Sequence, residues 1–179
     1  MSRLLLLLLI ACSYASAQET WQGLRFGMSE ADAQKAYRGT LRSAAGSDLL
    51  KALEDVDQKL EGMSAHAVLL FDKKTDALQQ IIVNAQKPFA GETNPTNAAG
   101  SSLAAINLLH RDLAEKYGTP ITEDGECNLT AAMIVRNPTH FSCKKIWKSG
   151  GQTITMNWFL FYGRLDLMSL TYKTIPKGI

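Results

Sequence analysis

The sequence predicts an α+β domain in which helices pack on one face of an antiparallel sheet. Three segments place apolar residues at helical spacing between capping residues, over 29–37, 47–60 and 101–117. Short apolar runs separated by turn residues occupy 65–83 and 141–172, and they indicate antiparallel strands. Helices and strands segregated in this way form two layers around one core. The order helix, hairpin, long loop, helix, meander also fits a duplicated helix-then-hairpin unit.

The first seventeen residues have the pattern of a secretory signal peptide. Arg3 supplies the positive charge, residues 4–10 are apolar, and Ala15-Ser16-Ala17 forms a small-residue cleavage site. A bilayer-spanning helix needs about 20 apolar residues, so this run is too short to serve as an anchor. We therefore expect residues 1–17 to be removed on export and no transmembrane span to remain.

A lipid anchor is the alternative at this end of the chain. Leu9-Ile10-Ala11-Cys12 is similar to the lipobox of bacterial lipoproteins, in which Cys12 would carry the lipid. In both cases residues 18–179 are long enough for one domain with a core of its own and short for two. We expect a single exported domain, periplasmic or secreted, or else held at the membrane through Cys12.

The charge balance gives no sign of a nucleic-acid partner. Residues 1–17 hold one of the 19 Lys and Arg and none of the 17 Asp and Glu, which leaves a net charge of +1 for the rest. Proteins that bind nucleic acid or anionic membranes carry a clear basic patch. Lys144, Lys145 and Lys148 form the main basic cluster, and a solvated strand edge explains it equally well.

Cys127 and Cys143 lie past the leader and form an even pair. In an oxidising compartment such a pair favours a disulfide, worth about 3 kcal/mol for a loop of this length. Free thiols or half of a metal site are the alternatives, but no close Cys-x-x-Cys or His at zinc-ligand spacing supports a metal.

The first half of the chain begins with two predicted helices. Ser29 is a good N-cap with Asp32 three residues later, so a short helix should run to Tyr37 and end at Gly39. Ser47 can cap a second helix that ends before Gly62. Its apolar face would consist of Leu49, Leu50, Leu53, Val56 and Leu60.

A hairpin and a long loop complete the first half. Residues 65–71 and 78–83 read as strands around a turn over 72–76. Residues 86–100 are rich in Pro, Gly, Asn and Thr and show no periodic apolar face. We expect this segment to be a loop, and long ordered loops are often functional.

The second half begins with a helix capped near Ser101 or Ser102. It should run to Tyr117, because Gly118 and Pro120 are typical of a helix end. Strands are then expected over 141–148, 153–162 and 165–172, with turns at 149–151 and 163, forming an antiparallel meander.

Two short motifs resemble segments of small bacterial periplasmic proteins. Residues 24–32, with Gly27-Met28-Ser29 followed by Asp32, are similar to the helix entry of outer-membrane-assembly small lipoproteins and of β-lactamase-inhibitor-like proteins. Residues 113–120 are similar to a helix exit of exported proteins with no assigned function. The resemblance implies helices placed before an antiparallel sheet and a binding role, and it assigns no functional residues. The additional helix predicted over 47–60 departs from strict repeat symmetry.

No catalytic motif occurs in the sequence. The histidines lack the spacing of a zinc protease, and neither a nucleophile elbow nor a phosphate loop is found. We expect structural imidazoles at His66 and His110. His140 lies near Cys143 in the sequence, but a disulfide would remove that thiol as a nucleophile. A solvated helix face accounts for a first group of acidic residues, Glu54, Asp55, Asp57 and Glu61. A second group, Glu123, Asp124 and Glu126, lacks the ligand spacing of a calcium loop. Neither a metal nor a cofactor is predicted.

The aromatic residues give the strongest indication of a functional surface. They gather in the C-terminal strands, at Trp147, Trp158, Phe159, Phe161, Tyr162 and Tyr172. If Trp158 faces the core, strand alternation turns Phe159 and Phe161 to the other face, where another element covers them or they stay exposed. We take Phe159, Phe161 and Trp147, with Phe89 of the 86–100 loop, as candidate binding residues.

These observations favour a non-catalytic, exported binding protein. It would engage another envelope or secreted protein through its sheet face and the 86–100 loop, because exposed aromatics offer a large contact area at little entropic cost. An exported hydrolase with a His and carboxylate site, centred on His110 or His140, is one alternative. A carrier of a small apolar ligand between helices and sheet is the other.

Overall fold

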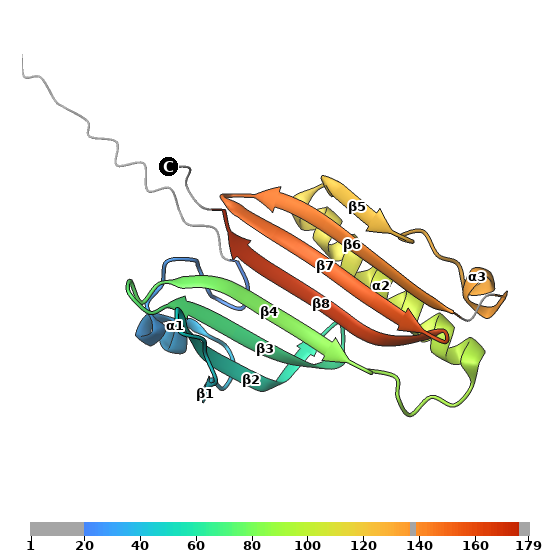
Figure 1. Cartoon of the computed structure of the whole chain (residues 1–179), viewed down its shortest axis with the longest axis horizontal. Coiled ribbons are helices and arrows are strands. Elements are labelled where there is room, and N and C mark those ends of the chain that lie inside the picture. The colour runs from blue at the N-terminus through green and yellow to red at the C-terminus, as the bar shows by residue number, and fades with distance from the viewer. Residues whose placement is uncertain (1–19, 137–138, 176–179) are drawn as a thin grey trace, which may run out of the picture.

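A single eight-stranded antiparallel sheet organises the protein (Figure 1). The computed structural model describes residues 20–136 and 139–175. The predicted signal peptide and Cys12 lie outside these residues. The helices are α1 (Glu30–Ala36), α2 (Pro95–Tyr117) and α3 (Ala131–Arg136). The strands are β1 (Arg42–Ala44), β2 (Leu50–Leu60), β3 (Met63–Asp72), β4 (Leu78–Gln86), β5 (Thr122–Gly125), β6 (His140–Ser149), β7 (Gln152–Phe161) and β8 (Arg164–Thr174).

Two antiparallel meanders meet at the centre of this sheet. The strand order is β1-β2-β3-β4-β8-β7-β6-β5, so the last strand of each half, β4 and β8, pair with each other. The short strands β1 and β5 form the two edges. Both halves therefore share one sheet, and one hydrophobic cluster runs through both of them.

The predicted fold class, a two-layer α+β domain, is wrong. Strand accounts for 45% and helix for only 23% of the structure, so the fold is mainly a large antiparallel sheet. The predicted helix-then-hairpin unit is wrong as well, because each half forms a meander of three long strands.

The largest single error is the helix predicted over 47–60, which is the strand β2. Leu53 and Asp55 point to the core side, opposite Leu69 and Ala67 of β3. A β-bulge between Asp55 and Gln58 then inserts one extra residue and shifts the alternation. This shift hides the two-residue period, and the remaining spacing of leucines imitates a helix.

The loop predicted over 86–100 is wrong in its second half. The helix α2 begins at Pro95, and the Asn94 side chain accepts hydrogen bonds from the backbone N–H groups of Thr96 and Asn97. An Asn N-cap followed by Pro is a favourable helix start. The apolar periodicity is weak here because small residues, Ala98 and Ala99 among them, pack this end of the helix closely. The connecting loop is therefore limited to residues 87–94.

Two local features that the sequence predicts, a disulfide and a helix cap, are present in the structure. Cys127 and Cys143 form the predicted disulfide, with 2.03 Å between the sulfur atoms, and it ties the segment before α3 to β6. The predicted N-cap of α1 is also confirmed, since Ser29 accepts a hydrogen bond from the Asp32 N–H.

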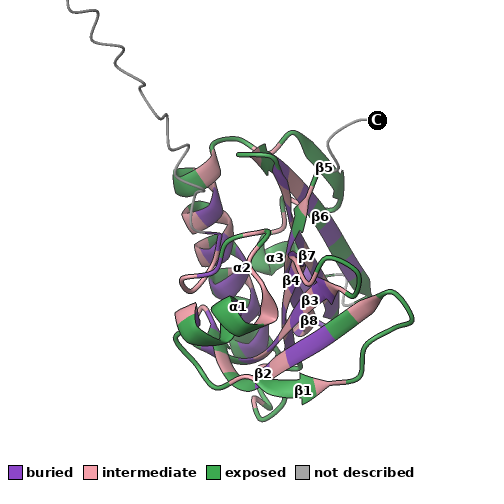
Figure 2. Ribbon diagram, turned by 90° about the vertical axis from the view of Figure 1, so that its left-hand side faces the viewer, coloured by how far each residue is buried: buried purple, intermediate pink, exposed green. Residues whose placement is uncertain are grey.

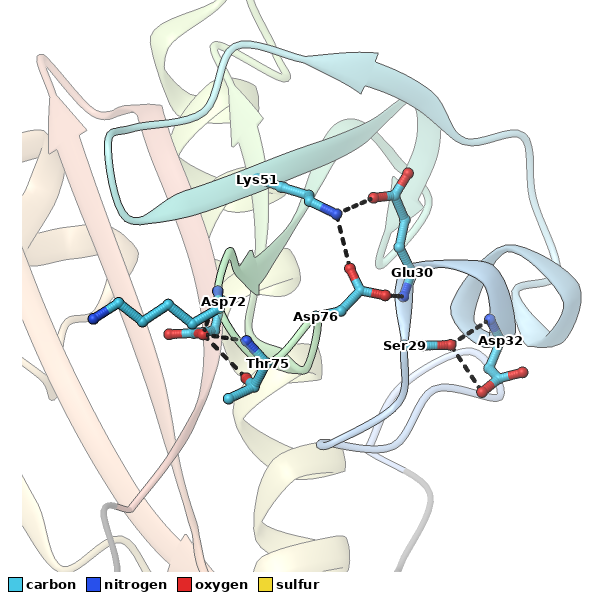
Figure 3. A network of polar contacts seen from close by, with 8 residues as sticks. Ser29, Glu30, Asp32, Lys51, Asp72, Thr75 and Asp76 are labelled. Atoms are coloured by element: carbon cyan, nitrogen blue, oxygen red, sulfur yellow. Dashed lines mark hydrogen bonds and ion pairs between the residues drawn. The ribbon is translucent and has the colours of Figure 1, made fainter.

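A network of charged residues joins α1 to the sheet (Figure 3). Lys51 of β2 donates a hydrogen bond to Asp76 at 2.9 Å and lies 3.6 Å from Glu30 of α1. The Asp76 carboxylate also accepts from the Glu30 N–H. The hydrogen bond from Lys51 is the main cause of the lowered pKa of Asp76. All these side chains are partly exposed, so the network positions α1 and adds little stability.

No helix in the described part of the chain is long and apolar enough to cross a membrane. The disulfide is compatible with an exported protein, because such bonds persist in oxidising compartments.

Candidate functional site

The two faces of the sheet differ completely in their surroundings. Alternate residues of each long strand are buried, as in β7 from Gln152 to Leu160, and together with α1 and α2 they form the core. Figure 2 shows both helices on the same side of the strands. The other face is turned to the viewer in Figure 1, and no described helix lies in front of it. We call this uncovered surface the open face.

Uncharged polar and β-branched side chains make up the middle of the open face. The strand register aligns them in rows that cross the sheet, and one row holds Asn84, Ser169 and Asn157. The neighbouring row holds Ile82, Thr171, Thr155 and Ile146. Ser169 is buried between its neighbours, and the other side chains of these two rows are half-buried. The open face therefore offers hydrogen-bonding groups on a firm backbone.

Four aromatic rings continue the open face to its end. Phe159 stacks on His140 with 6.1 Å between ring centroids and on Phe161 at 6.5 Å. Tyr162 meets Phe161 edge to face at 4.5 Å. Phe161 and Tyr162 are 50% and 62% exposed. We call these four residues the aromatic edge; its exposure is unusual because large aromatic side chains normally bury most of their area.

The structure shows on which face of the sheet each aromatic residue of β7 lies. Trp158 is buried in the core, and Phe159 and Phe161 lie on the opposite face, as the alternation predicts. Within the described residues, no helix or strand covers Phe161, which stays 50% exposed, and Phe159 is partly exposed.

A cleft of about 230 Å³ lies next to the aromatic edge. Its charged lining consists of Lys87, Arg164 and Asp166, and its apolar lining consists of Phe89, Ala90, Phe161 and Leu165. Phe89 comes from the loop after β4, so two candidate residues from distant parts of the sequence meet here. We call this the anchor cleft.

Trp147 does not belong to this surface. It is completely buried on the helix side of β6, and its indole N–H donates a hydrogen bond of 2.8 Å to the Gly118 carbonyl after α2. Its role in the structure is to hold the end of α2 against the sheet. Tyr172 is also buried, and burial raises the pKa of its phenol.

The predicted lysine cluster is divided between the two faces. Lys144 and Lys148 alternate with Lys145 and lie on the open face, where Lys144 is opposite Asp124 of β5. Lys145 is buried on the helix side, where its ammonium lies 3.0 Å from Glu123 and 3.4 Å from His110 Nε2. Only two of the three charges are therefore available on one surface.

The three histidines lie in three different settings. On the open face, His66 Nε2 lies 2.8 Å from the Glu54 carboxylate. His110 lies beside Lys145, and burial together with the charge of that lysine lowers the pKa of His110. His140 belongs to the aromatic edge. The described residues contain no cluster of three or more His, Cys, Asp or Glu that could hold a metal ion.

The acidic residues predicted on a solvated helix face lie in β2 and the turn after it. Asp55 is buried and accepts hydrogen bonds from Tyr37, from Gln58 and from the backbone N–H groups of Thr40 and Asp57. Burial by itself would raise the pKa of Asp55, but these hydrogen bonds outweigh it and lower the pKa. The prediction that Asp55 is solvated is therefore wrong, and its role is to hold the bulge of β2.

No protein-family model, curated protein or solved structure matches this chain.

Sequence reasoning missed Tyr162, Arg164 and Lys87 as members of the site. One signal for Tyr162 was present: Tyr162-Gly163 forms the two central residues of a hairpin turn, a position where Asn-Gly is preferred. No sequence signal pointed to Lys87 and Arg164, because only the pairing of β4 with β8 brings them together.

Proposed function

We propose that this protein is a non-catalytic, exported binding protein that holds another envelope or secreted protein against the open face and the aromatic edge. The observation that carries the proposal is the exposed, mutually stacked aromatic edge at the end of an uncovered sheet. A soluble chain rarely leaves such rings exposed together unless they contact a partner. The weak resemblance to envelope-assembly lipoproteins and β-lactamase-inhibitor-like proteins supports the same direction.

The shape of the surface favours a protein partner over a small ligand. Small-molecule sites are concave and bury most of the ligand, usually within about 300 to 1,000 Å³. The aromatic edge instead protrudes at a strand end, and the row of Asn84, Ser169 and Asn157 extends beside it over three strands. A central aromatic contact with a polar surround is the usual anatomy of a protein interface.

The test compares three single variants of the exported protein. Phe159→Ser and Phe161→Ser remove rings of the aromatic edge. Leu49→Ser is the matched control, because Leu49 is 70% exposed and lies before β2, at the opposite end of the strands. Each tagged protein is used to capture partners from envelope and culture-medium fractions. The partner retained by the wild type is then purified and its affinity measured by calorimetry.

We expect both Phe variants to keep the wild-type circular dichroism spectrum and to bind the purified partner at least ten times more weakly. Leu49→Ser should bind it as the wild type does. If both Phe variants retain full affinity, the aromatic edge is not the interface and the proposal is wrong. A partner found in the envelope fraction indicates an assembly role, and an enzyme found in the medium indicates inhibition.

One observation favours the hydrolase alternative, although at a different histidine from those first considered. The His66 and Glu54 pair supplies an imidazole next to a carboxylate beside an open cleft of about 240 Å³. His66→Ala should then abolish an activity found in a broad screen of hydrolase substrates without changing the circular dichroism spectrum. A wild-type protein that hydrolyses none of them contradicts this alternative.

A further inference from the structure

The anchor cleft has the size and lining of a pocket for one side chain. We propose, building on the binding function above, that it receives a single apolar side chain of the partner and that the partner places a carboxylate next to that side chain. The ligand class is therefore a protein segment in which an aromatic or large aliphatic residue is followed by acidic residues.

The volume and the apolar lining support the first part of this proposal. At about 230 Å³ the cleft is smaller than typical small-molecule sites and suits one inserted side chain. Phe89 and Phe161 form two of its walls, and Leu165, which is 1% exposed, lies at its base. An apolar side chain inserted between them would be removed from water where it contacts this lining, and such burial is the main source of interface free energy.

The charges around the cleft support the second part. Lys87 and Arg164 face it together with one carboxylate, that of Asp166. Asp166 lies 4.0 Å from Lys87, at the limit of an ion pair. Among the residues that the structure describes, no carboxylate pairs with Arg164. The cleft therefore carries a net positive charge with a guanidinium free to bind a carboxylate, for which Arg is well suited.

The backbone at Tyr162 is a separate observation that points to the same place. Tyr162 and Gly163 have φ values of 49° and 75°, as a tight hairpin turn requires. The corresponding turn after β2 is Glu61-Gly62, with φ values of 48° and 78°. The left-handed conformation is unfavourable for a bulky residue, and Asn or Gly is normally found there.

Burial does not compensate for this strain, since the Tyr162 side chain is 62% exposed. What the turn does accomplish is to hold the Tyr162 ring against Phe161, which lines the anchor cleft. Lys87, another residue of the cleft lining, also has a positive φ, of 44°. Strained backbone of this kind concentrates at functional sites, because function retains residues that stability alone would replace.

The experiment titrates the isotopically labelled protein with three capped hexapeptides and follows the backbone amide signals by NMR. The first peptide is Gly-Ser-Phe-Glu-Glu-Gly. The second replaces both Glu by Lys, and the third replaces Phe by Ser. We expect the first peptide to shift the amide signals of Phe89, Arg164 and Leu165, to bind at least five times more tightly than the second, and to lose binding in the third.

Three variants separate the parts of the proposal. Arg164→Gln should reduce the preference for Glu over Lys while Phe-dependent binding remains. Tyr162→Asn should raise the midpoint of thermal unfolding and weaken the first peptide. Gln22→Asn is the control for strain relief, because Gln22 and Gly23 have φ values of 52° and 87° and neither residue lines the anchor cleft. It should raise the midpoint without changing peptide binding.

The inference is wrong if the first peptide causes no shift at these amides, or if all three peptides bind equally. Failure of the inference is distinguishable from failure of the proposed function. If Phe161→Ser abolishes partner binding while the first peptide causes no shift at the cleft, the binding function stands and the anchor cleft does not. If Phe159→Ser and Phe161→Ser both leave partner binding intact, the proposed function itself is wrong.

Discussion

Ser102 makes a testable connection between α2 and the sheet. Its side chain is completely buried, donates a hydrogen bond of 2.7 Å to the Ala98 carbonyl and accepts one of 3.0 Å from the Leu165 N–H of β8. Ser102→Ala removes the acceptor and leaves that buried N–H without a partner. An unsatisfied buried donor costs about 1 to 3 kcal/mol.

Ser101 is the matched control, because it is exposed in the same turn of the same helix. Ser101→Ala changes only the helix propensity, which favours Ala over Ser by about 0.5 kcal/mol. Both variants receive this gain, so the difference between them isolates the buried hydrogen bond. We expect the free energy of unfolding of Ser102→Ala to lie about 1 to 3 kcal/mol below that of Ser101→Ala.

Urea unfolding followed by circular dichroism measures this difference, and the thermal midpoints should differ by about 2 to 4 °C for each kcal/mol. Hydrogen exchange adds a local readout, because the Leu165 amide should lose protection in Ser102→Ala alone. Equal free energies of unfolding for the two variants would refute the reasoning, since the Leu165 N–H would then not depend on Ser102.

Three further predictions concern the disulfide and two titrating groups. Replacing Cys127 and Cys143 by Ala should lower the free energy of unfolding by about 3 kcal/mol in non-reducing urea titrations, and an unchanged value would contradict a constraining role. The pKa of Asp55 is lowered in the folded state, so its contribution to stability is present above pH 4 and is lost as the pH falls through that lowered pKa. Asp55→Asn should therefore flatten the loss of stability as the pH falls below about 4, and a slope equal to the wild type's would count against the assignment. Lys145→Met should raise the pKa of His110 in an NMR titration, because the lysine charge is one cause of its lowering, and an unchanged value would exclude that cause.

The C-terminal meander could be predicted from the sequence because its information is local. Turn residues at Gly150-Gly151 and at Gly163 mark the ends of the strands, and the alternation from Ile154 to Leu160 is uninterrupted. The same rules place Phe159 and Phe161 opposite Trp158, so two residues of the aromatic edge were accessible in advance. Whether that face is covered was not accessible, since it depends on where the helices pack.

Two segments of the first half, β2 and the start of α2, resisted prediction for identifiable reasons. The bulge in β2 shifts the alternation at Asp55, and the two-residue period is then lost over a segment of eleven residues. At the start of α2 the buried residues are small, so the helix has no strong apolar stripe although Asn94 and Pro95 mark its beginning. Local patterns fail at both places because contacts with distant strands decide the conformation.

The sequence by itself was sufficient to predict the disulfide, the N-cap of α1, the hairpin of β3 and β4, and the last three strands. Each of these features depends on residues that are near one another in the chain. The pairing of β4 with β8 was decided only by the tertiary structure, since no local rule selects which distant strand a free edge will meet. That pairing creates the continuous open face and brings Lys87 and Phe89 beside Phe161 and Arg164. The anchor cleft is therefore a product of long-range packing, even though every side chain in it can be read from the sequence.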